Sequence, residues 1–132
     1  MAAERKRSRW PWVVAGIVAA LLMLWGAALI ARAIWFPGIP FDAAVWIDPS
    51  SQANGARLKM ADRLVAQGVL RGKSRDMVTS LLGVPPPTDY FRDWDLVYYL
   101  GPERGWLSID SEWLVVRFRK DDRVTEYRIV RD

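Results

Sequence analysis

The chain has no cysteine and no histidine among its 132 residues. Without cysteine it can form no disulfide, use no thiol nucleophile and carry no thiol-linked lipid. Without histidine it lacks the commonest general base and the commonest metal ligand of proteins. Metal sites that need thiolate or imidazole are excluded, so only oxygen-ligand sites remain. These absences favour a non-enzymatic protein, for which we expect no catalytic residue, no cofactor and no bound metal.

Charged residues are also absent from the twenty positions between Trp12 and Ala31. A helix of that length spans about 30 Å, the thickness of the hydrocarbon core of a bilayer. Aromatic residues that prefer the lipid–water interface occur at both ends of the segment: Trp10, Trp12, Trp35 and Phe36. The sequence predicts one membrane-spanning helix over residues 12–36.

Basic residues are concentrated on one side of this segment. The tail 1–11 contains four of them, whereas only Arg32 follows before Arg57. Because basic residues favour the cytoplasmic side, we expect the tail in the cytoplasm and the rest of the chain across the membrane. The residues 31–33 also fit a signal-peptidase site, after which a cleaved chain would begin at Ile34. The apolar stretch is longer than that of a signal peptide, which favours an uncleaved anchor.

The net charge of +4 comes from the N-terminal part of the chain. Residues 1–41 contain five basic side chains and one acidic one, whereas residues 42–132 contain fourteen of each. Nucleic-acid binding needs a basic surface that displaces counterions, and the neutral C-terminal region does not predict one. We expect no nucleic-acid partner.

Residues 37–55 are rich in turn formers and are interpreted as a linker. From 56 to 70, apolar residues recur at helical spacing, which predicts an amphipathic helix. A second, shorter helix is predicted between the N-cap Ser74 and Gly83. Its apolar face consists of Met77, Val78, Leu81 and Leu82.

Three segments after the helices are predicted to be strands: 96–100, which is β-branched and aromatic, 112–119, in which apolar residues alternate, and 123–130, which follows the turn at Asp121 and Asp122. Short connections between them predict an antiparallel meander with the two helices on one face. The predicted fold class is α+β, with the order α-α-β-β-β over residues 56–132.

The segment from Gly72 to Pro85, Gly-Lys-Ser-Arg-Asp-Met-Val-Thr-Ser-Leu-Leu-Gly-Val-Pro, resembles the glycine-to-proline helix of the SmpA/OmlA domain. That domain is found in BamE, a small lipoprotein of the outer-membrane β-barrel assembly machine. Residues 98–101, and later 114–118 with Val124, continue the pattern. The resemblance covers about residues 56–132 and implies a BamE-like, protein-binding role in assembly or maintenance of the cell envelope.

Members of this family that work in the assembly machine are held by a lipidated cysteine, which this chain lacks. A transmembrane anchor would place the domain at the bacterial inner membrane instead, facing the periplasm. The resemblance therefore implies the fold and the compartment more directly than the role. The same unit also resembles β-lactamase-inhibitor-type modules, which bind proteins. No catalytic residue is carried over from either.

Several residues that could suggest catalytic or metal chemistry have structural interpretations. The run 72–74, Gly-Lys-Ser, lacks the first glycine of a phosphate-binding loop and lies between two helices, so Ser74 is interpreted as a helix cap. The acidic residues in 89–95 and 110–112 are interpreted as solvated residues that flank strands, not as metal ligands. Ser108 and Ser111 have no histidine partner that could activate them.

Aromatic residues of the C-terminal region are the main functional candidates, because Trp and Tyr are the usual anchors of protein interfaces. Together with one arginine they form the predicted interface: Tyr90, Phe91, Trp94, Arg104, Trp106 and Trp113. The contrasting interpretation is that most of them pack into the core or against the helices. A separate interpretation places Trp46 and its neighbours at the membrane surface close to the anchor. We expect a non-enzymatic adaptor that contacts another envelope protein. The alternatives are a binding domain for a lipid or a peptidoglycan fragment, and a carboxylate-based enzyme.

Overall fold

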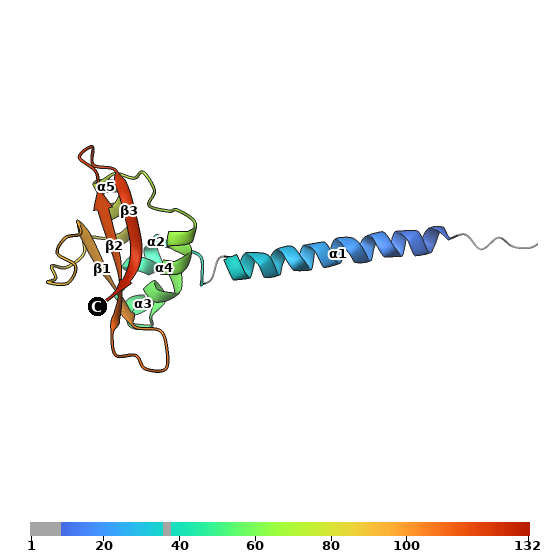
Figure 1. Ribbon diagram of the computed structural model, residues 1–132, viewed down its shortest axis with the longest axis horizontal. Helices are drawn as coiled ribbons and strands as arrows, with labels where there is room; N and C mark the ends of the chain where they lie inside the picture. The colour runs from blue at the N-terminus through green and yellow to red at the C-terminus, as the bar shows by residue number, and fades with distance from the viewer. Residues whose placement is uncertain (1–8, 36–37) are drawn as a thin grey trace, which may run out of the picture. The chain divides into compact units, whose positions relative to one another are not determined.

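The computed structural model describes residues 9–35 and 38–132. It divides into two compact units, the first formed by helix α1 (Trp10–Trp35) and the second by the chain after it. The described part of the second unit contains the following helices and strands (Figure 1): α2 (Ala43–Ile47), α3 (Pro49–Ala53), α4 (Ala56–Ala66), α5 (Arg75–Leu82), β1 (Leu96–Pro102), β2 (Ser111–Phe118) and β3 (Val124–Arg131). The predicted α+β class and its antiparallel meander are confirmed.

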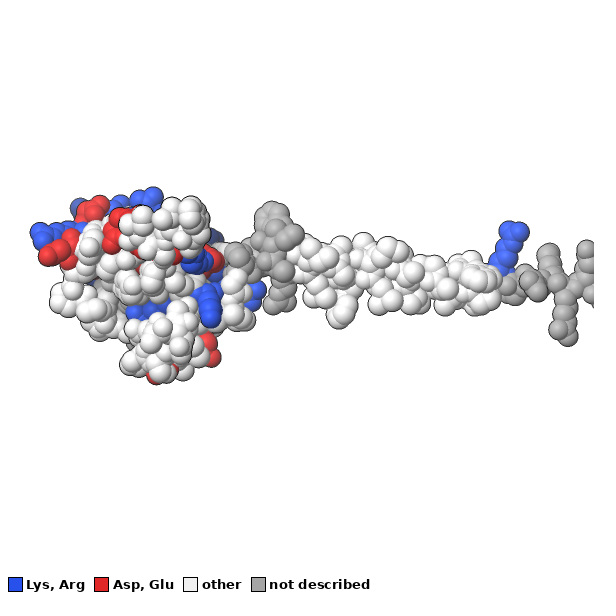
Figure 2. Space-filling view, turned by 90° about the horizontal axis from the view of Figure 1, so that it is seen from below, with Lys and Arg blue, Asp and Glu red and all other residues white. Residues whose placement is uncertain are grey.

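Helix α1 is long and apolar enough over Trp10–Ala31 to cross a membrane, and none of that stretch is buried inside the structure. The face of this stretch seen in Figure 2 carries no charged side chain. The prediction of a long apolar N-terminal helix is thus confirmed. Its expected C-terminal boundary at 36 and residues 1–8 of the basic tail lie outside the described residues.

The three strands follow in the order β1-β2-β3, and helices gather on one side of the sheet (Figure 1). On that side the buried apolar side chains of α2, α4, α5 and the sheet form one core. Its fully buried members of largest volume are Trp46, Tyr98, Met60, Leu64, Leu70, Leu82, Leu100 and Leu114. The Tyr98 hydroxyl donates a hydrogen bond of 2.8 Å to the carbonyl oxygen of Gly83, which ties β1 to the end of α5.

The interpretation of residues 37–55 as a linker needs correction, because α2 and α3 form there. Asp42 caps α2 by accepting hydrogen bonds from the first backbone N–H groups of that helix, and Asp48 caps α3 in the same way. The predicted turn residues Asp48 and Pro49 therefore begin a helix. Trp46 on α2 is fully buried in the core, so it does not lie at a membrane surface.

Helix α4 carries the predicted amphipathic pattern, with Met60, Ala61 and Leu64 fully buried against the sheet. It ends at Ala66, a few residues before the predicted boundary. Gly68 then adopts a positive φ of 68°, a conformation in which glycine is favoured after a helix.

Helix α5 begins and ends as predicted. The Ser74 side chain accepts a hydrogen bond from the backbone N–H of Met77, and Gly83 follows the last turn with a φ of 78°. Val78 and Leu82 are buried, but Met77 is 51% exposed, so its assignment to the buried face is corrected. The inner row of the helix is the i, i+4 pair Val78 and Leu82, and Met77 lies beside it.

The chain becomes part of the second unit at its first described residues. The backbone N–H of Ile39 donates a hydrogen bond of 2.9 Å to the carbonyl oxygen of Lys59 in α4. A Cβ atom at Gly38, where φ is 85°, would lie 2.1 Å from that same oxygen. Glycine is therefore required for this close approach. The C-terminal unit thus includes residues 38–55, which precede the expected boundary at 56.

Candidate protein-interaction surface

The face of the sheet opposite the helices, called here the outer face, carries a second apolar cluster. Along β2, Leu114 and Val116 point into the main core, whereas Trp113 and Val115 belong to the cluster on the outer face. This alternation follows from the two-residue period of a strand. The segment 90–94, just before β1, packs onto the outer face through Phe91 and Trp94.

Trp113 lies at the centre of this cluster. It stacks on Tyr90 with a ring-centroid distance of 5.1 Å, and it makes edge contacts with Phe91 at 6.3 Å and Tyr99 at 5.1 Å. Trp113 itself is buried, but Tyr90 and Tyr99 remain 51% and 44% exposed. We call these four residues the aromatic patch. Three of them were predicted as interface residues, and the structure brings those three together.

Tyr99 is the member of the patch that was predicted as a strand residue and not as an interface residue. It lies directly opposite Trp113 in the β1–β2 register. Opposed side chains of an antiparallel pair lie on the same face, so the alternation of the two strands was the available signal. To pair Tyr99 with Trp113, however, the register of β1 against β2 must be known. That register contains an irregularity between Tyr99 and Gly101, which sequence alone does not reveal.

Phe91 has a backbone φ of 52°, a conformation that is strained for a bulky side chain. Such strain costs about 1–3 kcal/mol and persists only where surrounding contacts compensate for it. Here the Phe91 ring packs against Trp113, and the Phe91 carbonyl oxygen accepts a 3.0 Å hydrogen bond from the N–H of Trp94. The turn that carries Tyr90 and Trp94 is therefore held in one conformation.

Trp94 lies beside the patch and is covered by two arginines. The guanidinium carbon of Arg117 is 4.2 Å from the Trp94 ring centroid, and that of Arg128 is 5.2 Å away. Arg117 also pairs with Glu126 at 3.3 Å. The two guanidinium groups thus make cation–π contacts with the Trp94 ring, and their charges are paired locally, Arg117 with Asp93 and Glu126 and Arg128 with Glu126.

A shallow groove of about 320 Å³ adjoins the patch. One wall is the proline segment 85–87, and the other is the start of β1 at Leu96 and Val97. Tyr90, Phe91 and Trp94 also line it, so the groove and the aromatic patch form one continuous surface.

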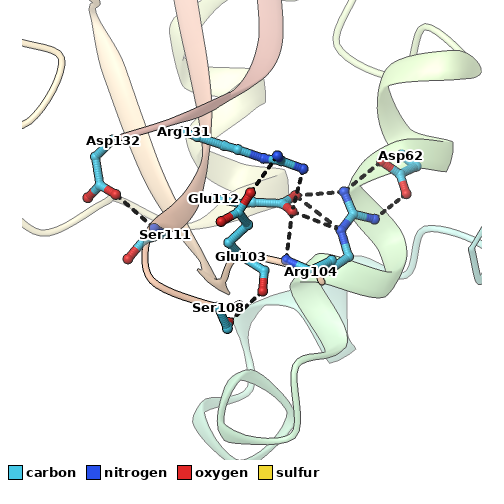
Figure 3. A network of polar contacts seen from close by, with 8 residues as sticks. All are labelled: Asp62, Glu103, Arg104, Ser108, Ser111, Glu112, Arg131 and Asp132. Carbon is cyan, nitrogen blue, oxygen red and sulfur yellow. Dashed lines mark hydrogen bonds and ion pairs between the residues drawn. The ribbon is translucent and has the colours of Figure 1, made fainter. Parts of the chain in front are cut away.

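Arg104, another predicted interface residue, belongs to a different structure at the end of the sheet (Figure 3). Its guanidinium contacts both carboxylate oxygens of Asp62 on α4, and its Nη2 atom lies 2.6 Å from Oε2 of Glu112 on β2. Arg131 approaches the same glutamate at 3.6 Å and pairs with Glu103 at 2.5 Å. Arg104 is therefore engaged within the domain, in a network that joins the β1–β2 loop to α4.

Glu112 is the buried member of this network, with 1% of its surface exposed. Burial raises the pKa of its carboxyl group, but the hydrogen bonds and positive charge of Arg104 outweigh burial and leave the pKa below its usual value. The same contacts raise the pKa of Arg104, through Asp62 first and Glu112 second. Both groups are thus held in their charged forms, which suits a structural ion pair.

Two further acidic candidates, Asp89 and Asp95, also have partners within the domain. Asp95 accepts a hydrogen bond of 2.8 Å from the backbone N–H of Phe118 and pairs with Arg75 at 3.4 Å. Asp89 pairs with Arg92 at 2.5 Å. In residues 9–35 and 38–132, no group of three or more carboxylates is placed to hold a metal ion.

Trp106, the last predicted interface residue, lies in the β1–β2 loop and is 93% exposed. The loop lies beyond the sheet end at which Arg104 is anchored, whereas the aromatic patch lies on the outer face. The six predicted residues therefore divide between an aromatic patch with its groove and a separate loop.

No family model matches the chain, and no curated protein or solved structure matches it significantly.

Proposed function

We propose that this protein is a membrane-anchored binding module that presents the aromatic patch to another protein of the cell envelope. The observation that carries the proposal is the half-exposure of Tyr90 and Tyr99 around the buried ring of Trp113. Partly exposed aromatic rings supported by a buried one have the anatomy of an interface hot spot.

The patch is suited to binding because its side chains are already ordered. The Tyr90 ring rests on Trp113, and the strained turn at Phe91 is fixed by packing. Binding of a partner would therefore cost little conformational entropy on this surface. The adjoining groove beside β1 would accept an extended segment with apolar side chains, and its opening onto the patch supports a continuous contact.

Helix α1 would be the anchor of this module. The positive tail before it and the scarcity of basic residues after it support an N-terminus in the cytoplasm and a domain in the periplasm. The resemblance of residues 72–85 to the SmpA/OmlA helix supports the same compartment and a role in envelope assembly or maintenance. The partner would then be a protein that reaches the periplasmic side of the inner membrane.

The groove is also the site at which the alternative, a lipid or peptidoglycan fragment, would bind. It is shallow and open to solvent, whereas small-ligand sites usually enclose most of the ligand. Glu112, a buried carboxylate, pairs with Arg104 and has a lowered pKa, so it does not suit the role of a general acid. Of the three functions, protein binding is therefore the best supported.

Site-specific photo-crosslinking in the native membrane tests the proposal. A photoreactive phenylalanine analogue replaces Tyr90 in one variant of the full chain and Tyr99 in a second. Lys120, an exposed residue of the β2–β3 turn, is replaced in the control. We expect positions 90 and 99 to give an adduct with the same protein, identified by mass spectrometry, and position 120 to give none.

The matched disruption is Tyr99→Ala, combined with the photoreactive residue at position 90. It should weaken the adduct at least tenfold while leaving the thermal unfolding midpoint of the domain close to that of the unsubstituted chain. Equal crosslinking at 90 and 120, or an adduct that Tyr99→Ala does not change, would contradict the proposal. An adduct with lipid or glycan alone would support the small-ligand alternative.

A further inference from the structure

The β1–β2 loop ends in an uncharged, apolar tip, defined here as residues 105–109, Gly-Trp-Leu-Ser-Ile. Its three large side chains point into solvent: Trp106 is 93% exposed, Ile109 79% and Leu107 55%. Exposure of three large apolar side chains within four residues costs free energy in water, because this surface could otherwise be buried. Contact with an apolar environment outside the domain would remove this cost.

The base of the loop is braced, so the tip does not fold back onto the domain. The backbone N–H of Glu103 donates a hydrogen bond of 2.8 Å to the carbonyl oxygen of Asp110, which closes the loop. Arg104, the residue before the tip, is held by Asp62 on α4 and by Glu112 on β2 (Figure 3). Arg104 is thus paired within the protein, and the three large side chains that project beyond it, Trp106, Leu107 and Ile109, are apolar.

The loop and the start of the C-terminal unit attach to the same turn of α4. Ile39 is bonded to the carbonyl oxygen of Lys59, and Arg104 is bound by Asp62. Lys59 and Asp62 are three residues apart, which in a helix corresponds to a rise of about 4.5 Å. Within the C-terminal unit, therefore, the apolar tip is braced close to the point where the chain arrives from α1.

The connection from α1 is short. Four peptide steps separate Trp35, the last residue of α1, from Ile39, and an extended chain covers at most about 14 Å in that distance. If α1 spans the bilayer, as the proposed function states and as this inference requires, the turn of α4 that holds the tip cannot be far from the membrane surface.

We propose that the apolar tip inserts into the interfacial region of the bilayer that holds α1, and so gives the domain a second contact with the same membrane. Tryptophan prefers the lipid–water interface, and leucine and isoleucine favour the hydrocarbon below it. The single occupant proposed for Trp106, Leu107 and Ile109 is lipid. Its role is to fix the orientation of the domain, and thereby of the aromatic patch, with respect to the membrane.

Because the chain has no cysteine, single cysteines report on individual positions without any other change. Leu107→Cys, Lys120→Cys and Met23→Cys are each labelled with the environment-sensitive dye NBD in the full chain. Each is reconstituted into vesicles of phosphatidylcholine and phosphatidylglycerol, with and without nitroxide-labelled lipid. Position 107 reports on the tip, 120 on the turn at the opposite end of β2, and 23 on the middle of α1.

We expect nitroxide lipid to quench the dye at 107 at least threefold more than at 120, with a blue-shifted emission at 107. Adding Trp106→Ser and Ile109→Ser to Leu107→Cys should lower quenching at 107 to the level of 120. The same two substitutions in the Met23→Cys chain should leave strong quenching at position 23 unchanged.

Failures of the two proposals are distinguishable. Strong quenching at 23 with equal, weak quenching at 107 and 120 would overturn the tip insertion and leave the anchor intact. A blue shift at 107 without lipid quenching would show that protein, a second copy included, covers the tip, and would also overturn it. Weak quenching at 23 would overturn the anchor, and the tip insertion with it.

Discussion

Glu112 is a buried carboxylate, with only 1% of its surface exposed to solvent. A charge is tolerated there because Arg104 reaches it from the β1–β2 loop and Arg131 from β3. Arg104 also binds Asp62, which lies 42 residues earlier in the chain. Removing one member of such a buried group leaves its partners with uncompensated charge, which costs more than the intact group contributes.

Glu112→Gln should therefore lower the free energy of unfolding by about 1–3 kcal/mol at pH 7, since Arg104 keeps Asp62 but loses its second carboxylate. The pKa of Glu112 is lowered in the folded state, so its contribution is present above the ordinary Glu pKa and is lost as pH falls through the folded value. The difference between the two chains in denaturant titrations should be constant from pH 6 to 8. It should shrink below about pH 4. A difference that grew on acidification would contradict the role given to Glu112.

Gly101 and Gly105 form a matched pair of glycines with nearly the same backbone. Their φ angles are 148° and 152°, but a Cβ at Gly101 would lie 2.6 Å from Cδ1 of Leu58, whereas a Cβ at Gly105 would meet open space. Both substitutions to alanine should cost about 1–3 kcal/mol through backbone strain. Gly101→Ala should cost measurably more, because Leu58 on α4 must move. Equal shifts in thermal melts would show that the contact between β1 and α4 is loose.

At the scale of elements, α4, α5 and β2 could be predicted from their periodic apolar patterns, and β1 and β3 from their composition and the short turns that bound them. Helices α2 and α3 could not, since five residues are too few to show a helical period. They exist because Asp42 and Asp48 cap them and because the core surrounds Trp46. Short helices of this kind depend on tertiary contacts that a local pattern does not contain.

The candidate site was predictable to a similar degree. Aromatic content and strand alternation indicated Tyr90, Phe91 and Trp113, which do meet on the outer face. Arg104 was predicted to lie on the same surface, but it is bound by Asp62. That contact joins residues distant in sequence, so no local pattern reveals it. Sequence could thus indicate which residue types form a surface, but not how the fold distributes them between two regions.

Helix α5 gives a direct test of which side chains hold it to the sheet. Leu82→Ala should cost about 2–5 kcal/mol because that side chain is fully buried. Met77→Ala, at an exposed position of the same helix, should change stability by no more than about 0.5 kcal/mol. Ser74→Ala should cost about 1 kcal/mol through loss of the cap. A cost for Met77→Ala as large as that for Leu82→Ala would mean that α5 is rotated from the described orientation.

The boundary of the C-terminal unit gives a second test at this scale. A chain of residues 38–132 should fold cooperatively, because it keeps Trp46 and the bond between Ile39 and Lys59. A chain of residues 56–132 should lose most tertiary structure, since removal of a buried tryptophan alone costs about 3–5 kcal/mol. Near-ultraviolet circular dichroism and thermal melts of both chains would decide. Equal melting temperatures would restore the interpretation of 37–55 as a linker.

At the scale of the whole molecule, we propose that the two units have different functions, one in anchoring and one in binding. Helix α1 has no buried residue over its apolar stretch and would hold the protein in the membrane, whereas the second unit has its own core and carries the aromatic patch. The apolar tip of residues 105–109 would then contact the same membrane. A binding surface fixed at two points would meet its partner in a defined orientation, which reduces the entropy lost on binding.

This arrangement requires one topology, and single cysteines can establish it in intact cells because no native cysteine competes. Lys120→Cys, in the β2–β3 turn, should react with a membrane-impermeant maleimide as soon as the periplasm is accessible. Ala3→Cys, in the basic tail, should react only after the inner membrane is permeabilised. We expect this orientation because of the positive charge of residues 1–11. Replacing their four basic residues with glutamine should therefore produce a fraction of chains with the opposite labelling.

Labelling of Ala3→Cys without permeabilisation would contradict the predicted orientation. A mature chain that begins at Ile34 in mass spectrometry would show instead that α1 is removed as a signal peptide.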